Sequence, residues 1–456
     1  MKTLTLEQHR KRIENVSAAE KDNRVYFRRK RVRDYMPGQV MYHLGDYPAR
    51  FSVAPTEYDE KLLEELTKNG AELIQVHEEW NDRVRHLGAD KFTAFDPEGM
   101  QKFVDLCHRQ GLKIIPYISS GYFHEYDPDF REDFLRARCY TQGGMEFKYV
   151  QCWHGSAYWR DYLLPRTFAA VDKYGFDGIY NDVGHDGWSL AWRKARAEGK
   201  DFPEFPYDPE LEDLLCTIYS GVKERGGIYK VHYNRDDLPP CKDKIYDYLF
   251  IGEGISNSRL GTGKDFPDYV IPWADLSKPM NATMEMDYHF VRTIPFLQFP
   301  LLQRGRPVYG ACTDVDIPRY GDMGPNSEYG KYLQIKNYMK EHPEGPYAYD
   351  CSTTIPPRED FYPLWCKYLA LYKPMVEENS LVYMELRDCG EILSALPERI
   401  CASMFVNEEK YLVVSNLSEE PYTLELRDNW LDRERDVMGN VFTIQPDRMV
   451  FLKKLP

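Results

Sequence analysis

The sequence lacks the features that mark secreted, membrane-spanning or metal-centred proteins. No window contains an apolar stretch of signal-peptide or transmembrane length. Ten cysteines are present, but none forms a C-x-x-C pair or clusters with histidines at metal-ligand spacing. These absences predict a cytoplasmic protein that has reduced cysteines and no bound metal.

Motifs for cofactors and for nucleic acid are also missing. Neither a glycine-rich dinucleotide loop nor a P-loop occurs, so we expect no cofactor. The net charge of −14 would repel polyanions, which argues against nucleic acid or an anionic membrane as the main partner. The basic run at residues 28–33 is the exception, and we interpret it as a solvated segment or an oligomer contact in preference to a nucleic-acid site.

The composition is that of a globular enzyme. Of the 456 residues, 43% are hydrophobic and 14% aromatic, which excludes a disordered or fibrous chain. The length exceeds that of one small domain and suits a barrel with an accessory module. The 35 tyrosines and 8 tryptophans also suit a sugar-binding cleft, although packing accounts for most residues of these types.

Short apolar runs alternate with amphipathic stretches of helical length, which is typical of a parallel sheet wrapped in helices. Glycines at positions 70, 111 and 175 follow three of these helical stretches, where a left-handed cap is needed. We therefore predict an α/β fold with a (β/α)8 TIM barrel over residues 39–375. The expected strands lie at 39–45, 72–80, 113–121, 176–184, 228–234 and 248–254, with weaker candidates within 269–286 and at 307–314.

The pattern changes after residue 375 to short alternating strands separated by turn residues. This change predicts a small all-β sandwich domain over residues 376–456. Residues 1–38 are left as an N-terminal extension.

Polar and acidic residues gather where the predicted barrel strands end. In a TIM barrel these ends converge on one face, which carries the active site. Taken singly, each residue could instead be a loop polar group or a helix cap. The candidates are His43, His77, Glu78, Tyr117, Asn181, Asp182, His232, Asn234, Glu253 and Asp314.

Two carboxylates stand out among them. Asp182 ends an apolar strand and is followed by Gly184, while Glu253 lies between two glycines after another strand. Cleavage of a glycosidic bond requires one carboxylate that attacks or stabilises the anomeric carbon and a second carboxyl that protonates the leaving oxygen. The alternative for each is structural, as a cap for Asp182 and a buried salt-bridge partner for Glu253.

Residues 156–184, which include the motif DGIYND, resemble the segment leading into strand 4 of retaining (β/α)8 glycoside hydrolases of the α-galactosidase and α-glucosidase type. The resemblance implies that Asp182 is the nucleophile and that Glu253, after strand 6, is the general acid/base. It also implies a C-terminal β-sandwich. Many members have Asp as the acid/base and a large N-terminal β-sandwich, which this chain has no room for. The same context followed by Glu is similar to dextranase-like enzymes, which include transglycosylases.

Other residues receive supporting roles. Trp153 and Trp273 are expected to stack on a sugar ring, and His232 and Asn234 to bind hydroxyls, with packing as the alternative for each tryptophan. His77 followed by two glutamates is similar to a metal-ligand cluster. However, neighbouring residues of a strand point to opposite faces, so we expect no metal site there.

The sequence thus predicts a glycoside hydrolase that cleaves a small, α-linked glycoside by a retaining double displacement. The expected partner is a carbohydrate substrate, and a homo-oligomer is possible. Two alternatives stay open. One is a transglycosylase or sugar-isomerising enzyme on the same barrel, and the other is a carbohydrate-binding barrel without catalysis.

Overall fold

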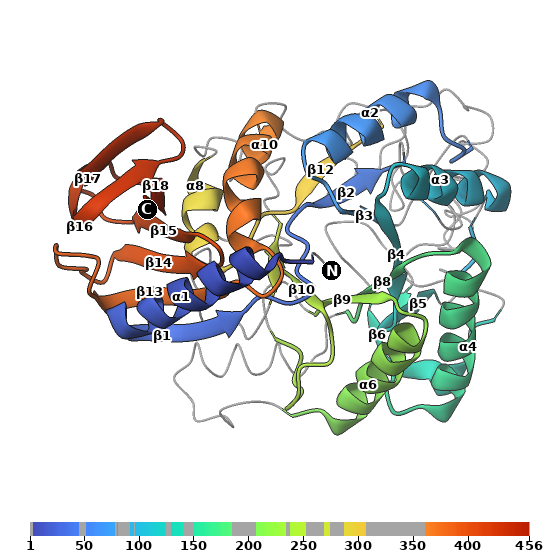
Figure 1. The fold of residues 1–456 in the computed structure, drawn as a ribbon. Coiled ribbons are helices and arrows are strands. Elements are labelled where there is room, and N and C mark those ends of the chain that lie inside the picture. The colour runs from blue at the N-terminus through green and yellow to red at the C-terminus, as the bar shows by residue number, and fades with distance from the viewer. Residues whose placement is uncertain are drawn as a thin grey trace.

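Figure 1 shows the computed structural model of the chain, in which an α/β barrel lies beside a C-terminal β domain. Within the described residues, no helix is both long enough and apolar enough to cross a membrane. The structure describes residues 3–44, 52–77, 80, 92–94, 96–124, 129–139, 149–184, 207–233, 238–251, 269–273, 287–306 and 361–455.

The barrel consists of eight parallel strands in the order β11-β10-β9-β8-β4-β3-β2-β12. A parallel bridge between Trp273 and Leu301 joins the two edges of this sheet and closes the barrel. The predicted (β/α)8 fold is therefore confirmed. The strands are β2 (Gln39–His43), β3 (Leu73–Val76), β4 (Lys113–Ser119), β8 (Gly178–Asp182), β9 (Ile228–His232), β10 (Tyr248–Ile251), β11 (Val270–Pro272) and β12 (Leu302–Gly305).

Helices cover the outside of the barrel (Figure 1). The side chains of Asp96, Ser156 and Asp208 accept backbone N–H groups at the starts of α3, α4 and α6, as N-caps do. The three glycines predicted to follow helices all have positive φ, between 70° and 96°. The helices are α2 (Glu57–Lys68), α3 (Pro97–Arg109), α4 (Ala157–Tyr174), α6 (Pro209–Glu224) and α10 (Phe361–Tyr372).

The eighth strand differs from the prediction. The strand that pairs with β2 is β12, at Leu302–Gly305, whereas we expected it at 307–314, a segment outside the described residues. The β-branched and aromatic residues of PVYGACTD favoured the later segment on propensity. In the structure the shorter segment Leu302–Gly305 forms the strand, although it contains polar residues, because it pairs with β2 and buries Leu302.

An insertion between β4 and α4 forms a small antiparallel sheet with strand order β5-β7-β6. Because a helix of a βα unit begins on the face where the preceding strand ends, this insertion lies beside the C-terminal face of the barrel. Its elements are β5 (Tyr122–His124), η2 (Glu132–Phe134), β6 (Leu135–Cys139) and β7 (Tyr149–Cys152).

The C-terminal domain is one seven-stranded antiparallel sheet with the order β1-β13-β14-β15-β18-β16-β17. Its edge strand β1 comes from the N-terminal segment and contains most of the basic run, so the N-terminal extension belongs to this sheet. The helix α1 (Leu6–Asp22) precedes it. The strands are β1 (Asn23–Arg31), β13 (Leu381–Cys389), β14 (Ile400–Val406), β15 (Lys410–Asn416), β16 (Tyr422–Asp432), β17 (Val437–Ile444) and β18 (Arg448–Lys454).

The central strands of this sheet are buried on both faces. Alternate residues of β13 show this, because Val382 and Met384 pack into the barrel core while Tyr383 packs into a separate core of the β domain. The barrel side of the contact is formed by the 3-10 segments η5 (Ile294–Phe296) and η8 (Lys373–Val376) and by α10, whose tyrosine rings contact Phe451 and Phe405. The β domain is therefore fixed against the barrel through apolar contacts.

Candidate active site

Asp182 lies at the C-terminal end of β8, the fourth barrel strand, with its side chain 15% exposed. Its Oδ2 accepts a hydrogen bond from the hydroxyl of Tyr117 at 2.6 Å, and its Oδ1 accepts one from the backbone N–H of Gly184 at 3.0 Å. Both donors stabilise the ionised carboxylate and fix its orientation. The carboxylate is thus held in a defined position at the face where barrel enzymes carry out chemistry.

The backbone around Asp182 is held just as firmly. Its carbonyl accepts the N–H of Ser120 and the hydroxyl of Ser119, each at 3.0 Å. A Cβ on Gly121 would lie 1.7 Å from the carbonyl oxygen of Val183, so only glycine allows the β4 and β8 loops to approach this closely. These contacts fix the position from which the Asp182 side chain projects.

His232 lies next to Asp182 on the neighbouring strand β9. Its Nδ1 lies 3.6 Å from Oδ1 of Asp182, because the register of β8 and β9 pairs the two residues. The imidazole packs on Phe250 and Tyr180, with ring centroids 5.1 and 6.4 Å away. His232 is therefore placed to donate a hydrogen bond to Asp182 or to a bound ligand.

Aromatic rings link further predicted residues to this group. The ring of His77 lies 4.8 Å from that of Tyr117, whose hydroxyl holds Asp182. The indole of Trp273 is 5.8 Å from Phe250, the ring that also packs on His232. The structure thus brings together four predicted site residues around Asp182, namely Tyr117, His77, His232 and, through Phe250, Trp273.

Two predicted residues face elsewhere. Asn181 points to the opposite side of β8 from Asp182, where its amide donates to the hydroxyl of Tyr229, a residue that packs on α6. Trp153 lies between β7 and α4, directly after β7, and its indole N–H donates to Glu210 on α6. In the described structure neither side chain contacts the Asp182 group.

Several predicted site residues lie outside the described residues. They are Glu78, Asn234, Glu253 and Asp314. The carboxyl separation of roughly 5 Å that a retaining pair of Asp182 and Glu253 would require therefore stays a prediction.

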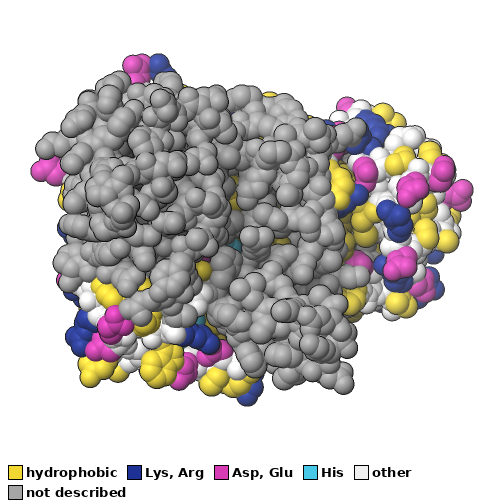
Figure 2. Space-filling view, turned by 180° about the vertical axis from the view of Figure 1, so that it is seen from behind, with side chains coloured by type: hydrophobic (Ala, Val, Ile, Leu, Met, Phe, Trp, Pro, Cys, Tyr) yellow, Lys and Arg dark blue, Asp and Glu magenta, His cyan; other side chains and the backbone are white. Residues whose placement is uncertain are grey.

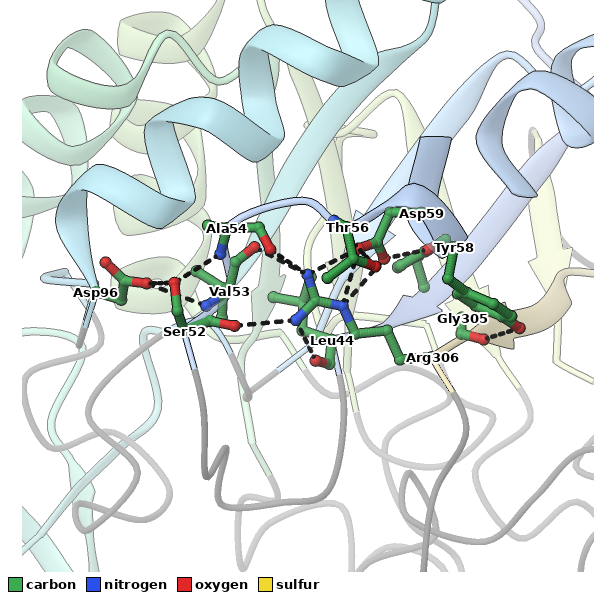
Figure 3. A network of polar contacts seen from close by, with 11 residues as sticks. Leu44, Ser52, Val53, Ala54, Thr56, Tyr58, Asp59, Asp96, Gly305 and Arg306 are labelled. Carbon is green, nitrogen blue, oxygen red and sulfur yellow. Dashed lines mark hydrogen bonds and ion pairs between the residues drawn. The ribbon is translucent and has the colours of Figure 1, made fainter. Parts of the chain in front are cut away.

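His43 belongs to a second polar group at the ends of β2 and β12. Its Nε2 lies 2.7 Å from the side-chain amide nitrogen of Gln303, and both residues are buried. Next to this pair, Arg306 donates to the carbonyls of Leu44 and of residues 52–54, and to the buried carboxylate of Asp59, as Figure 3 shows. This guanidinium ties the start of α2 and both described ends of the loop after β2 to the end of β12.

Sequence reasoning missed Lys230, which lies on β9 two residues before His232. Its side chain is fully buried, and Nζ donates to Oε1 of Gln39 on β2 at 3.0 Å. Among the described residues no carboxylate pairs with it, and the rings of Tyr180 and Phe250 lie 5.8 and 5.5 Å from Nζ. Burial holds the pKa of Lys230 well below its usual value of 10.5, which favours the neutral amine inside the barrel.

The effect of Lys230 on stability should depend on pH. Since the pKa of this amine is lower in the folded chain than in the unfolded chain, where it is about 10.4, folding is opposed more strongly as the pH falls from 10. Relative to Lys230→Met, the free energy of unfolding of the wild type is expected to rise as the pH increases towards 10, by at most about 1.4 kcal/mol per pH unit. Urea unfolding of both proteins at several pH values measures this slope, and equal slopes would contradict a neutral buried amine.

The described residues contain no group of three or more His, Cys, Asp and Glu side chains that could hold a metal ion. The described site offers a positioned carboxylate with neighbouring hydrogen-bond donors, Tyr117, His232 and the N–H of Gly184.

Comparisons with known proteins give structural matches alone. No family model matches the sequence, and no curated protein does. A maltogenic α-amylase from Thermotoga neapolitana has a TM-score of 0.55 at 14% identity, with 92% of this chain and 100% of that chain covered. An α-galactosidase from Geobacillus stearothermophilus has a TM-score of 0.52 at 10% identity, with 91% and 56% covered. A trehalulose synthase variant has a TM-score of 0.50 at 11% identity, with 92% and 100% covered.

At these identities the likeness concerns the fold. It extends over more than nine tenths of this chain in each case, so it includes the barrel and the β domain together. The chain therefore has the barrel fold with a C-terminal β domain that is also found in solved amylase-type and α-galactosidase structures.

Proposed function

We propose that the protein is a retaining glycoside hydrolase that acts on an α-linked glycoside, with Asp182 as the nucleophile. The observation that carries the proposal is the Asp182 carboxylate at the end of the fourth barrel strand, oriented by Tyr117 and Gly184 and largely shielded from water. The fold likeness to an α-amylase and an α-galactosidase supports the same reaction class by analogy.

The reaction proceeds in two steps. Asp182 attacks the anomeric carbon while the glycosidic oxygen leaves with a proton from the general acid, which gives a glycosyl ester on the enzyme. Water, deprotonated by the same acid/base group, then attacks the anomeric carbon and releases Asp182. We keep Glu253 as the acid/base on the sequence alone, because it lies outside the described residues.

The residues around Asp182 support this role. Its two hydrogen bonds hold the carboxylate in one orientation, and they leave further lone pairs on the oxygens for the anomeric carbon. The rings of His77 and Trp273 and the imidazole of His232 are proposed to contact the sugar, the rings by stacking and His232 by binding a hydroxyl. Asp314, Glu78, Asn234 and His43 stay candidate substrate contacts from the sequence.

The test is a screen of chromogenic α- and β-glycosides, followed by NMR of the first sugar released. We expect hydrolysis of at least one α-glycoside and a first product of α configuration, because two displacements at the anomeric carbon retain it. A β product would show inversion and would remove the nucleophile role from Asp182. Inactivity towards every glycoside would favour the non-catalytic alternative.

A second candidate function is transfer to another sugar or isomerisation, for which the fold likeness to a trehalulose synthase is the specific support. The same Asp182 ester would then be intercepted by a sugar hydroxyl instead of water. Product analysis with and without an added acceptor sugar separates the two, since transfer yields new oligosaccharides at the expense of free sugar.

A further inference from the structure

Exposed aromatic side chains gather around the first turns of α4 and α6. Among the described residues five aromatic side chains are exposed, and three of them lie here: Trp153 at 43%, Tyr158 at 54% and Tyr207 at 42%. We name these three residues the rim aromatic cluster. Figure 2 shows that the described surface in the region of α4 and α6, at the lower left, mixes hydrophobic side chains with acidic and basic ones.

The indole of Trp153 is fixed in spite of its exposure. Its Nε1 donates to Oε2 of Glu210 at 2.6 Å. Glu210 can reach it because residue 155 is glycine, where a Cβ would lie 2.5 Å from the Glu210 carboxyl carbon. An exposed ring held by a charge-assisted hydrogen bond loses little freedom when a ligand covers it, so it is preorganised for binding.

Arg160 joins the two helices that carry the cluster. Its guanidinium donates to the carbonyls of His154 and Glu210, at 2.6 and 2.9 Å, and pairs with Asp213. The turn that carries Trp153 and the first turn of α6 are therefore connected by one side chain. The cluster rests on a rigid scaffold and does not depend on a free loop.

Each tyrosine of the cluster has a cation over its ring. Nζ of Lys242 lies 4.0 Å from the ring centroid of Tyr207, and the guanidinium carbon of Arg131 lies 4.7 Å from that of Tyr158. Each cation orients its ring. The rings thus combine apolar surface with nearby charged donors and acceptors, as recognition of a sugar with its apolar faces and hydroxyl edges requires.

We propose that the rim aromatic cluster is a second carbohydrate site that binds a neutral oligosaccharide chain, with Trp153 as its main platform. The choice of a carbohydrate rests on the proposed function. Acidic residues near Trp153 and Tyr207 are matched by basic ones, and Asp208 lies 3.7 Å from Arg136, so no excess of positive charge is available for an anionic chain.

The position of the cluster also fits a chain that reaches the reaction site. The helix α6 follows β8, the strand that ends in Asp182, and α4 follows the insertion after β4. Their first turns therefore border the C-terminal face of the barrel. The rim aromatic cluster and Asp182 therefore belong to the same face of the barrel.

The test uses the full chain with Asp182→Asn, which keeps the probe intact during the measurement. Native gels contain soluble starch or, separately, dextran, and the shift in mobility gives the dissociation constant. We expect retardation in at least one gel, and Trp153→Ala in the same background should weaken binding about tenfold, since it removes a stacked aromatic surface. Tyr207→Ala should also weaken binding, and it serves as the second variant in case Trp153→Ala does not fold.

The matched control is Phe27→Ala, an exposed aromatic residue on β1 that is not part of the cluster. Its mobility should equal that of the Asp182→Asn parent. The proposal is overturned if no gel retards the parent, or if both cluster variants bind as tightly as Phe27→Ala. Binding that depends on Trp153 in a protein whose wild type hydrolyses no glycoside would sustain this site and remove only the proposed catalysis.

Discussion

Asp182→Asn is expected to lower kcat/KM on a chromogenic glycoside at least about a thousandfold, because an amide cannot form the glycosyl ester. The protein should remain folded. The change is nearly isosteric, and the Tyr117 hydroxyl can still donate to the remaining amide oxygen. The backbone contacts of Asp182 do not involve its side chain and persist. Initial rates and circular dichroism of the purified variant measure both parts of this expectation.

The matched control is Asp172→Asn on the exposed face of α4, where Asp172 pairs with Arg225. The same chemical change there should leave the rate within a factor of about two, since surface ion pairs contribute little. An Asp182→Asn enzyme that turns over at the rate of Asp172→Asn would exclude Asp182 as the nucleophile. A variant that loses both activity and its circular dichroism spectrum would assign Asp182 a structural role.

The position of Asp182 could be predicted from the sequence because it needs only local information. An apolar run ending in an acid and a glycine marks the C-terminal end of a buried strand, and the barrel rule gives that end its functional face. Its contact with Tyr117 could not be predicted, because it joins residues 65 positions apart and depends on the register of β4 against β8. Each residue was a candidate, but their pairing needed the fold.

The direction of the Asn181 side chain could have been predicted from the sequence. Successive residues of a strand point to opposite faces, so Asn181 and Asp182 cannot both face the barrel interior. Applying the alternation would have placed Asn181 towards the helices, where it contacts Tyr229. The orientation of Trp153 could not be predicted from strand alternation, because it depends on the insertion between β4 and α4 and on the hydrogen bond to Glu210.

Two structural features had no sequence signal of their own. Lys230 lies within the run IYKVH, a strand that is buried on both faces. The sequence does not show what its side chain contacts, because its partner Gln39 lies on a strand across the barrel. The basic strand β1 alternates exposed and half-buried residues, but its partner β13 lies more than three hundred residues later. Long-range pairing of this kind sets domain boundaries that a composition change cannot locate.

Arg306→Met is expected to destabilise the protein by about 3 to 5 kcal/mol, because it leaves the carboxylate of Asp59 charged, buried and without its ion-pair partner. Asp59 is inaccessible to solvent, and Nη2 of Arg306 lies 2.9 Å from its Oδ2. The variant also loses the hydrogen bonds to the carbonyls of Leu44 and of residues 52–54, which hold the loop after β2 (Figure 3). Chemical unfolding followed by tryptophan fluorescence measures the loss.

The matched control is Arg399→Met, which removes an exposed arginine that lies 3.8 Å from Glu419. It should change stability by less than about 1 kcal/mol. The double variant Arg306→Met with Asp59→Asn should recover part of the loss, since a neutral amide can still accept from Tyr42. If Arg306→Met were as stable as Arg399→Met, the contacts of Arg306 would contribute nothing to the stability of the protein.

The pH dependence gives this prediction a signature that a packing defect lacks. Burial alone would raise the pKa of Asp59, but the hydrogen bonds and charge of Arg306, together with hydrogen bonds from Tyr42 and Thr56, outweigh it and lower the pKa below its usual value of 3.8. In the wild type this carboxylate therefore contributes stability that is present above about pH 3.9 and is lost as the pH falls through its folded pKa. In Arg306→Met burial is opposed only by the hydrogen bonds from Tyr42 and Thr56, so the pKa of Asp59 should rise from its value in the folded wild type. The stability deficit of the variant should then be largest near pH 7 and shrink towards pH 4.5, where Asp59 takes up a proton, whereas a deficit equal at both pH values would assign the loss to packing alone.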